Sequence, residues 1–340
     1  MRTIEWKEDG VRIVDQTTLP DELRFITCTD YGRLARAIET MEIRGAPAIG
    51  VAAAMAVALA AKASRGTTAA EVVRDLEEAS ERVGKTRPTA RNLFWALERM
   101  RGVWEESKAE DAGMLKTSII NEAVEMAEED VRVCRALGRN GSELIEDGDT
   151  VLTHCNAGGL ACVEHGTALG VVRSSIEAGK RVFVYCTETR PLLQGARLTA
   201  FELKNDGIPF KLITDNMVAY AMENGLIRKV VVGADRVTRD GDVVNKVGTC
   251  GIAIMAREFG IPFYAAAPMS TVDLSVRAED IVIEQRAAEE VTHIRGLRIA
   301  PEGTEVLNPA FDLTPYRYVS GIITEKGIAR PPCDLSVLFR

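Results

Sequence analysis

Four stretches of this sequence decide its fold: VLTHCNAGG at 151–159, RVFVYCTETRP at 181–191, KLITDNM at 211–217 and KVVVGADRV at 229–237. Each begins with a short apolar run and ends at a polar cluster, as a buried β-strand does where it meets a loop. Helix-like segments separate them, and this alternation predicts a parallel sheet with crossover helices. Because ligands bind beyond the carboxyl ends of such strands, the polar clusters are candidates for a catalytic site.

The residues before these stretches follow other patterns. TIEWKEDGVRIVDQTTLP at 3–20 predicts two strands joined by a turn at 8–10, and apolar residues from Asp30 to about Gly141 recur at helical spacing. We therefore predict an α/β protein of two domains. A smaller, mainly helical domain with an N-terminal β-hairpin covers 1–141, and a Rossmann-like parallel sheet domain covers 142–340.

The composition excludes several functional classes. The 340 residues are 46% hydrophobic and 27% charged, which is ordinary for a soluble globular protein. The net charge of −8 argues against a general nucleic-acid binder, which needs a basic face. The first residues form no apolar signal region, and the apolar run at 48–61 is shorter than the roughly 20 residues of a membrane span. We expect a cytoplasmic protein that binds neither nucleic acid nor a membrane.

The cysteines and histidines do not form a familiar metal-binding pattern. The seven cysteines show no CxxC or zinc-like spacing, and their odd number fits reduced thiols in a reducing compartment. The three histidines, at 154, 165 and 293, are dispersed. No GxGxxG lies between a strand and a helix, which argues against a dehydrogenase. We predict neither a metal nor another cofactor.

RGAPAIG at 44–50 precedes an Ala-rich helical segment and is a candidate phosphate site. Gly45 and Gly50 allow a ligand close to the backbone, and Pro47 suits a first helical turn. The N-terminus of a helix offers free N–H groups, and the Arg44 guanidinium can bind phosphate through two donors. The alternative is a plain helix start with a solvated arginine.

Two further polar residues lie at predicted element boundaries. Arg87, beside the helix-stopping Pro88 and ahead of the potential cap Thr89, is either a phosphate ligand or an exposed charge. Gln194 follows Pro191 near a helix start, where it either bonds a sugar hydroxyl or is an exposed helix residue.

Cys155 and Asp235 are the candidates for chemistry at the strand ends. A Gly-containing turn after Cys155 can expose N–H groups, and a helix starting there would lower the pKa of the thiol. Burial beside an apolar strand would raise the pKa of Asp235 toward a value suited to proton donation. The alternatives are a buried structural cysteine and an aspartate that caps a turn. Asn245 and Lys246 follow, with Lys246 placed to pair with a phosphate or with Asp235.

Together these motifs match a family. The chain resembles the 5-methylthioribose-1-phosphate isomerases over nearly its whole length, through RGAPAIG, TRPTARNL, LTHCNAGGLA, TETRPLLQGARLTAFEL, GADRVTRDGDVVNKVGT and APEGTEVLNPAFDLTP. Relatives share much of this pattern, including ribose-1,5-bisphosphate isomerases and regulatory subunits of the exchange factor for translation initiation.

The resemblance implies an aldose–ketose isomerase that converts 5-methylthioribose 1-phosphate to 5-methylthioribulose 1-phosphate in methionine salvage. It assigns catalysis to Cys155 and to Asp235, the proton donor. It implies a homodimer that uses no metal. The implied substrate contacts are Arg44, Gly45, Ala46, Arg87, Gln194, Asn245 and Lys246.

The reaction leaves two routes open. The anomeric oxygen carries phosphate, so an acid must protonate the ring oxygen before the ring can open. The hydrogen on carbon 2 then reaches carbon 1 through an enolate-type intermediate or as a hydride. Cys155 is the base in the first route and stabilises charge in the second. The competing functions are those of a ribose-1,5-bisphosphate isomerase and of a non-catalytic, translation-factor-like subunit. Separately, Cys250 lies close in sequence to Asn245 and Lys246, which leaves its contact with the site an open question.

Overall fold

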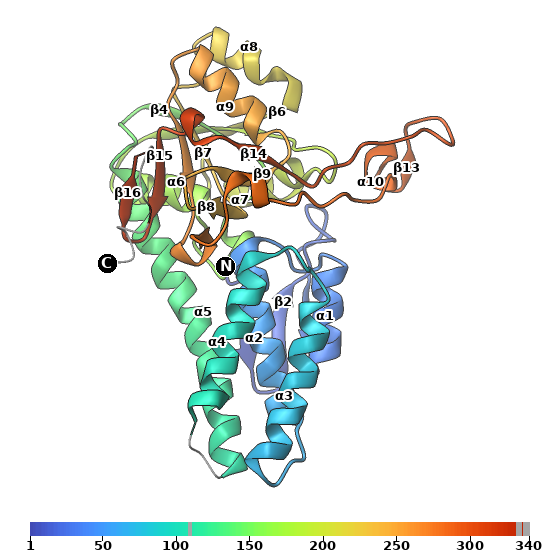
Figure 1. The fold of residues 1–340 in the computed structure, drawn as a ribbon. Helices are drawn as coiled ribbons and strands as arrows, with labels where there is room; N and C mark the ends of the chain where they lie inside the picture. Colours follow the sequence, from blue (N-terminus) through green and yellow to red (C-terminus); the bar gives the residue numbers. More distant parts are fainter. Residues whose placement is uncertain (108–110, 331–334, 336–340) are drawn as a thin grey trace. The chain divides into compact units, whose positions relative to one another are not determined.

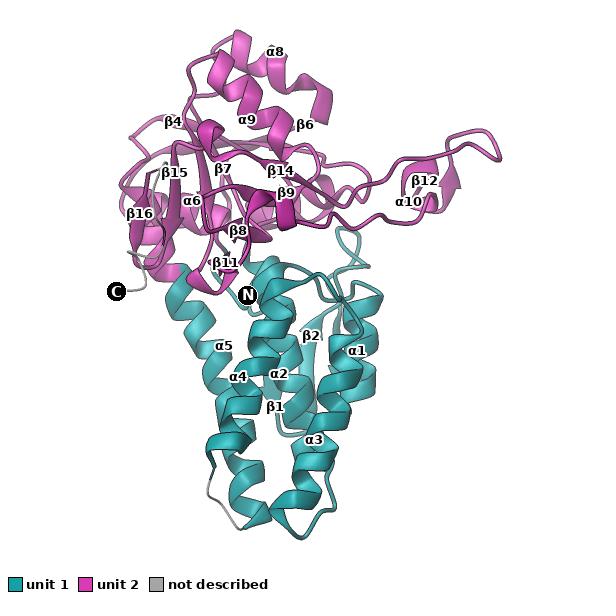
Figure 2. Ribbon diagram, viewed as in Figure 1, with its two compact units in different colours: residues 1–134, 159–166 teal, residues 135–158, 167–340 magenta. Residues whose placement is uncertain are grey.

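A computed structural model of the chain describes residues 1–107, 111–330 and Leu335. It divides into two compact units (Figure 2). Unit 1 holds residues 1–134 and 159–166, and unit 2 holds residues 135–158 and 167–340. The predicted domain boundary between residues 141 and 142 remains a prediction. The two units differ from the predicted domains at two segments: residues 135–141 belong to unit 2, and residues 159–166 belong to unit 1.

Unit 1 combines a small sheet with long helices (Figure 1). The predicted hairpin is formed by β1 (Ile4–Lys7) and β2 (Gly10–Val14), which pair antiparallel. A third strand, β3 (Phe25–Cys28), pairs with β2 and was not predicted. The helices are α1 (Tyr31–Glu39), α2 (Ala46–Ala63), α3 (Ala69–Gly84), α4 (Arg91–Glu106) and α5 (Ala112–Ser142).

Helix α2 is the centre of unit 1. Residues 48–61 of this helix are all buried, and its many alanines let α1, α3 and α4 pack closely against it. Among the described residues it alone is long and apolar enough to cross a membrane, and 78% of it is buried inside the protein. That burial is typical of the core helix of a globular domain.

Unit 2 contains the predicted parallel sheet. Its seven strands lie in the order β16-β15-β10-β7-β4-β5-β6, parallel except for the edge strand β16. The four decisive stretches supply its middle and one edge, which confirms the predicted fold class. The strands are β4 (Asp149–Thr153), β5 (Val182–Thr187), β6 (Phe210–Ile213), β7 (Lys229–Val232), β10 (Phe263–Ala266), β15 (Gly321–Thr324) and β16 (Gly327–Ala329).

Both faces of the central strands of this sheet are buried, as in other parallel sheets. Val230 and Val232 of β7 belong to one apolar core, whereas Val231 between them belongs to the other, because successive side chains of a strand point to opposite faces. The helices of unit 2 are α6 (Ala168–Glu177), α7 (Ala200–Asn205), α8 (Val218–Glu223), α9 (Thr249–Glu258) and α10 (Glu289–Thr292). Short helical turns are η1 (Gly159–Ala161, in unit 1), the π-helix η2 (Gly195–Thr199), η3 (Asp215–Met217), η4 (Met269–Thr271), η5 (Ala278–Asp280) and η6 (Tyr316–Tyr318).

A second, four-stranded sheet in unit 2 was not predicted. Its order is β11-β8-β9-β14, with β8 (Arg236–Thr238), β9 (Val243–Lys246), β11 (Val272–Asp273) and β14 (Phe311–Thr314). The chain also forms a small hairpin of β12 (His293–Ile294) and β13 (Leu297–Arg298), which projects from unit 2 together with α10 (Figure 1). Asp235 precedes β8, and Asn245 and Lys246 end β9, so the second sheet positions three of the predicted site residues.

Candidate active site

The thiol of Cys155 is held in place by its backbone and by its neighbours. Cys155 lies two residues beyond the end of β4 and is buried, with a φ of 65° in the left-handed region. Its N–H donates to Thr189 Oγ1 at 2.8 Å, and its carbonyl accepts from Thr199 Oγ1 at 2.7 Å. A non-glycine residue in this conformation persists where its surroundings enforce it, often at functional sites. The α-helix that would start at the turn after Cys155 is not found in the described part of the chain. The turn is followed by the short η1, and α6 starts only at Ala168.

Gln194 lies against that thiol. It is buried, and its Nε2 donates to Cys155 Sγ at 3.3 Å. Its Oε1 is also buried and has no hydrogen-bond partner within the described part of the chain. A buried acceptor without a donor is costly, so the Gln194 carbonyl is available to a hydroxyl of a bound ligand. The structure thus brings two of the predicted site residues into contact.

The end of β5 completes this side of the site. Thr189, a β-branched residue with a φ of 63°, is fully buried. Its N–H and that of Arg190 donate to the two carboxylate oxygens of Asp215, at 2.8 and 2.7 Å. Asp215 follows β6, so the end of one strand fixes the end of its neighbour. This agrees with the expectation that the polar clusters meet at one edge of the sheet.

His154 connects the Cys155 turn with the chain after β9. Its Nδ1 lies 2.7 Å from Thr187 Oγ1, and its Nε2 lies 2.9 Å from the carbonyl oxygen of Val247. Burial lowers the pKa of His154, which favours the neutral ring. Because a carbonyl can only accept, the neutral ring carries its hydrogen on Nε2 and accepts from Thr187. Sequence reasoning missed this role, although the histidine is adjacent to Cys155.

Asp235 is tied to the same region through its neighbours in the chain. A Cβ atom on Gly233 would lie 2.7 Å from Ala157 Cβ, so the chain after β7 packs directly against the turn that follows Cys155. The Asp235 N–H donates to the carbonyl oxygen of Val244 at 2.9 Å, which joins it to β9. The Asp235 side chain is partly exposed, as a proton donor to a ligand must be.

The two residues that end β9 are held by different partners. Asn245 is buried, and its Nδ2 donates to Thr249 Oγ1 at 3.0 Å. Lys246 Nζ donates to the carbonyl oxygen of Ala310 at 2.6 Å and lies 4.5 Å from the centre of the Phe311 ring. Its ammonium group is therefore positioned by β14, the neighbouring strand of the second sheet.

Asp312 organises the segment that follows. Its carboxylate accepts from the N–H groups of Gly248, at 2.7 Å, and Cys250, at 3.1 Å, at the start of α9. Burial nevertheless raises the pKa of Asp312 to about 6. Cys250 thus joins this network through its backbone, while burial and the Asp312 charge raise the pKa of its thiol.

The predicted phosphate ligands lie in unit 1. Gly45 is the N-cap of α2 with a φ of 98°, and a Cβ atom there would lie 2.5 Å from Ala161 Cα. Only glycine fits this helix start, and as the N-cap it has no side chain with which to cap the N–H groups. Arg44 and Ala46 flank it, both partly buried. Arg87, also partly buried, lies between α3 and α4; the expectation that Thr89 caps α4 was wrong, since Ala90 is the N-cap.

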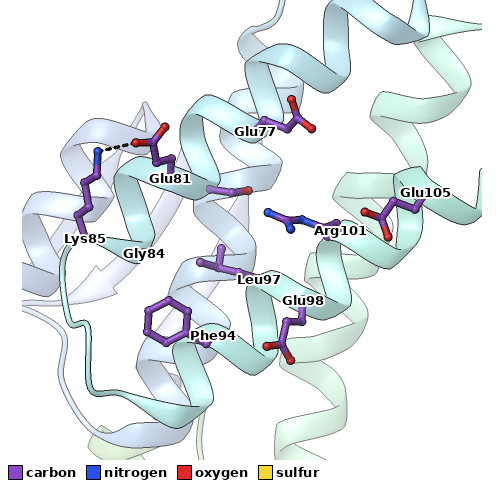
Figure 3. A pocket seen from close by; sticks show the side chains of 10 residues that line it. Glu77, Glu81, Gly84, Lys85, Phe94, Leu97, Glu98, Arg101 and Glu105 are labelled. Atoms are coloured by element: carbon purple, nitrogen blue, oxygen red, sulfur yellow. Dashed lines mark hydrogen bonds and ion pairs between the residues drawn. The ribbon is translucent and has the colours of Figure 1, made fainter.

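A groove of about 690 Å³ between α3 and α4 is not the predicted site. Figure 3 shows Arg101 pointing into it, surrounded by glutamates on both helices. None of the residues predicted to bind substrate or act in catalysis lines it. The carboxylates of Glu77, Glu81, Glu98 and Glu105 would repel an anionic sugar phosphate.

Comparison with known proteins supports the resemblance in sequence. Residues 42–331 match the model of the initiation factor 2 subunit family. A methylthioribose-1-phosphate isomerase of Geotalea uraniireducens is 54% identical over 97% of this chain and 95% of its own length. The crystal structure of 5-methylthioribose 1-phosphate isomerase from Pyrococcus horikoshii OT3 has a TM-score of 0.93 at 44% identity, covering 99% of this chain and 95% of that one.

A second solved structure is that of a protein with a different described role. The crystal structure of a protein described as translation initiation factor eIF-2B, subunit delta, from A. fulgidus has a TM-score of 0.89 at 45% identity, and the match covers 100% of both chains. A fold shared at this level does not distinguish a catalytic role from a regulatory one, so this distinction must be argued from the residues of the site.

Proposed function

We propose, from the premise that the chain belongs to the initiation factor 2 subunit family and within it to the methylthioribose-1-phosphate isomerases, that Cys155 and Asp235 carry its reaction. The chain is an aldose–ketose isomerase of methionine salvage that converts 5-methylthioribose 1-phosphate to 5-methylthioribulose 1-phosphate. The observation that most supports the catalytic assignment is the buried Cys155 thiol, held in the left-handed conformation with Gln194 donating to its sulfur.

The first step is the opening of the sugar ring. Asp235 donates its proton to the ring oxygen, since the phosphorylated anomeric oxygen has no hydroxyl proton to lose. Its partial exposure and its attachment to β9 through Val244 support this role. Lys246, held by Ala310, supplies a positive charge for the anionic substrate.

The second step moves a hydrogen from carbon 2 to carbon 1. A cysteine that abstracts a proton from carbon must be held close to that carbon. We propose the enolate route, with Cys155 as the base, because the contact from Gln194 fixes the sulfur in position. Turnover in deuterium oxide separates the routes, because a base exchanges its proton with solvent and a hydride shift carries no solvent deuterium into the product.

The unit 1 residues are proposed as substrate ligands. The N–H groups at the start of α2, next to Arg44, Gly45 and Ala46, suit a phosphate, and Arg87 adds a second guanidinium. Gln194 Oε1 and Asn245 are the proposed partners of the sugar hydroxyls. We further propose that the enzyme works as a homodimer in the cytoplasm, without a metal in the reaction.

Two competing functions can be tested alongside. A ribose-1,5-bisphosphate isomerase needs a second phosphate site in place of an apolar pocket for the methylthio group. A translation-factor-like subunit, suggested by the likeness to the A. fulgidus protein, needs no catalytic residues. The test is to supply each sugar phosphate separately to the purified chain and to follow the ketose product. Preference for 5-methylthioribose 1-phosphate supports the proposal; preference for the bisphosphate, or no turnover of either together with a stoichiometric partner in a pull-down, refutes it.

A further inference from the structure

Three metal-ligating side chains meet inside unit 1, outside the residues proposed for catalysis. A carboxylate oxygen of Asp130 and the sulfur atoms of Cys134 and Cys162 all lie within 4.8 Å of one another. Both thiols are buried, with exposures of 0% and 1%, and neither forms a disulfide. Asp130 and Cys134 are four residues apart on α5, which places them on one face of the helix.

The third ligand comes from a distant part of the chain that is fixed in position. Cys162 follows η1, and the next residue, Val163, donates its N–H to Asp130 Oδ2 at 2.7 Å. The Val163 carbonyl accepts from the Thr3 N–H at 2.8 Å. The other carboxylate oxygen, Oδ1, faces Cys134 Sγ at 4.0 Å. The backbone therefore holds the thiols and the carboxylate together without a ligand.

The surroundings favour a cation at this point. Asp130 is itself partly buried, and removing its carboxylate from water has a cost that a bound cation would offset. The positive charge of Arg2 interacts with the Asp130 carboxylate, but its guanidinium donates its hydrogen bond, at 2.7 Å, to Glu128, which lies on α5 as Asp130 does. A divalent ion would satisfy the carboxylate and, by displacing their protons, convert both thiols to thiolate ligands.

We propose that Asp130, Cys134 and Cys162 form a structural binding site for a thiophilic divalent cation, with zinc as the ion that this ligand set fits best. Two sulfur ligands and one oxygen ligand suit zinc, which accepts four ligands in a tetrahedron. A water molecule or a small shift of a neighbouring group supplies the fourth. The spacing of cysteines along the sequence does not reveal this site, because its ligands come from α5 and from a separate segment.

The bound ion would fasten residues 159–166 to α5. That segment contains Ala161, against which Gly45 packs at the start of α2, and it continues directly from the turn that contains Cys155. Metal binding would therefore stabilise unit 1 and the proposed phosphate-binding helix start, and it would not take part in the isomerisation.

The test uses the full chain, stripped with a chelator under reducing conditions and then titrated with Co²⁺ and with Zn²⁺. We expect thiolate-to-cobalt charge-transfer absorption that saturates near one equivalent, loss of this absorption on adding Zn²⁺, and a higher melting temperature with Zn²⁺. Cys134→Ser, Cys162→Ser and the conservative Asp130→Asn should each weaken cobalt binding. Cys250→Ser, which alters a more exposed thiol in unit 2, should leave the absorption unchanged.

Several results would overturn the proposal. They are the absence of cobalt–thiolate absorption in the wild type, an unchanged signal in both cysteine variants, and loss of the signal in Cys250→Ser alone. Peptide mapping of the protein as isolated that finds Cys134 and Cys162 joined in a disulfide would also overturn it, since no thiolates would remain. Circular dichroism of each variant separates lost binding from lost folding, and the wild-type titration tests the site even if a variant fails to fold.

Discussion

At the scale of single residues, the site depends on backbone conformations that most side chains avoid. Cys155 and Thr189 both have positive φ values and share a hydrogen bond. Each such residue costs of the order of 1–3 kcal/mol, which the rest of the fold must offset. The result is a thiol at a defined position beside Gln194, which a relaxed turn would not provide.

Asp235 is the residue whose replacement should affect chemistry most selectively. Asp235→Asn keeps the shape of the side chain but removes the proton that opens the ring, so we expect kcat to fall by about 10²- to 10⁴-fold. Circular dichroism and melting temperature should stay close to those of the wild type. Asp240→Asn, at an exposed position of the turn between β8 and β9, is the matched control and should be fully active. Steady-state turnover that is alike in the two variants would remove Asp235 from the mechanism.

Gly45 should be irreplaceable for a steric reason. Gly45→Ala places a methyl group 2.5 Å from Ala161 Cα at a φ of 98°, so we expect a loss of stability of about 1–3 kcal/mol. Gly102→Ala is the matched control, because nothing lies within 4 Å of its added methyl group and alanine favours the helix. Urea denaturation that shows equal stability for both variants would contradict the packing described at the start of α2.

At the scale of elements, the network between β14 and α9 should make the activity depend on pH. The pKa of Asp312 is raised to about 6, so the group takes up its proton as the pH falls through this value and its acceptance from Gly248 and Cys250 weakens. We therefore expect kcat/KM to fall below about pH 6 as the segment after Lys246 loosens. Asp312→Asn, which cannot ionise, should lose this acid limb.

The raised pKa of Asp312 has the opposite effect on stability, because protonation at low pH stabilises the fold while it lowers the activity. The folded-state pKa of Asp312 lies above the ordinary carboxyl value of about 4, so the folded protein binds this proton more tightly than the unfolded chain does. Ionised Asp312 therefore lowers the free energy of unfolding above about pH 6, and this loss of stability disappears as the pH falls toward about 4. Loss of activity near pH 5.5 should therefore occur without unfolding at Asp312. An acid limb that persists unchanged in Asp312→Asn would show that another group controls it.

The strands that the sequence predicts are those with longer apolar runs. The strands β4, β5, β6 and β7 were predicted because each is a short apolar run that ends at polar residues. The strands β8 and β11 have three and two residues, too few for an alternating pattern to appear. The second sheet was missed for this reason, and with it the role of β14 in holding Lys246.

At the scale of the whole molecule, the sequence could not show how the chain divides. Residues 159–166 belong to unit 1 although they lie between two strands of unit 2. Nothing in their composition marks this change, because it depends on contacts with Asp130 and Gly45, far away in the sequence. The contact between Cys155 and Gln194 likewise joins residues 39 positions apart, so the sequence indicated both residues but not their pairing.

The proposed homodimer gives a simple prediction for the intact protein. Light scattering after size-exclusion chromatography should give a mass close to twice the 37.0 kDa of the chain. A mass that stays at one chain across a range of protein concentrations would contradict the proposed assembly. It would leave the assignment of Cys155 and Asp235 untouched.

The most direct test of the account is the turnover of 5-methylthioribose 1-phosphate by the wild type and by Cys155→Ala, measured side by side. We predict that the wild type forms the ketose and that kcat of the variant is lower by about 10²- to 10⁴-fold, while the variant keeps its fold. Cys186→Ala, which removes a buried thiol of the same sheet, is the control and should retain most of the activity. A Cys155→Ala variant as active as the wild type would contradict the central claim.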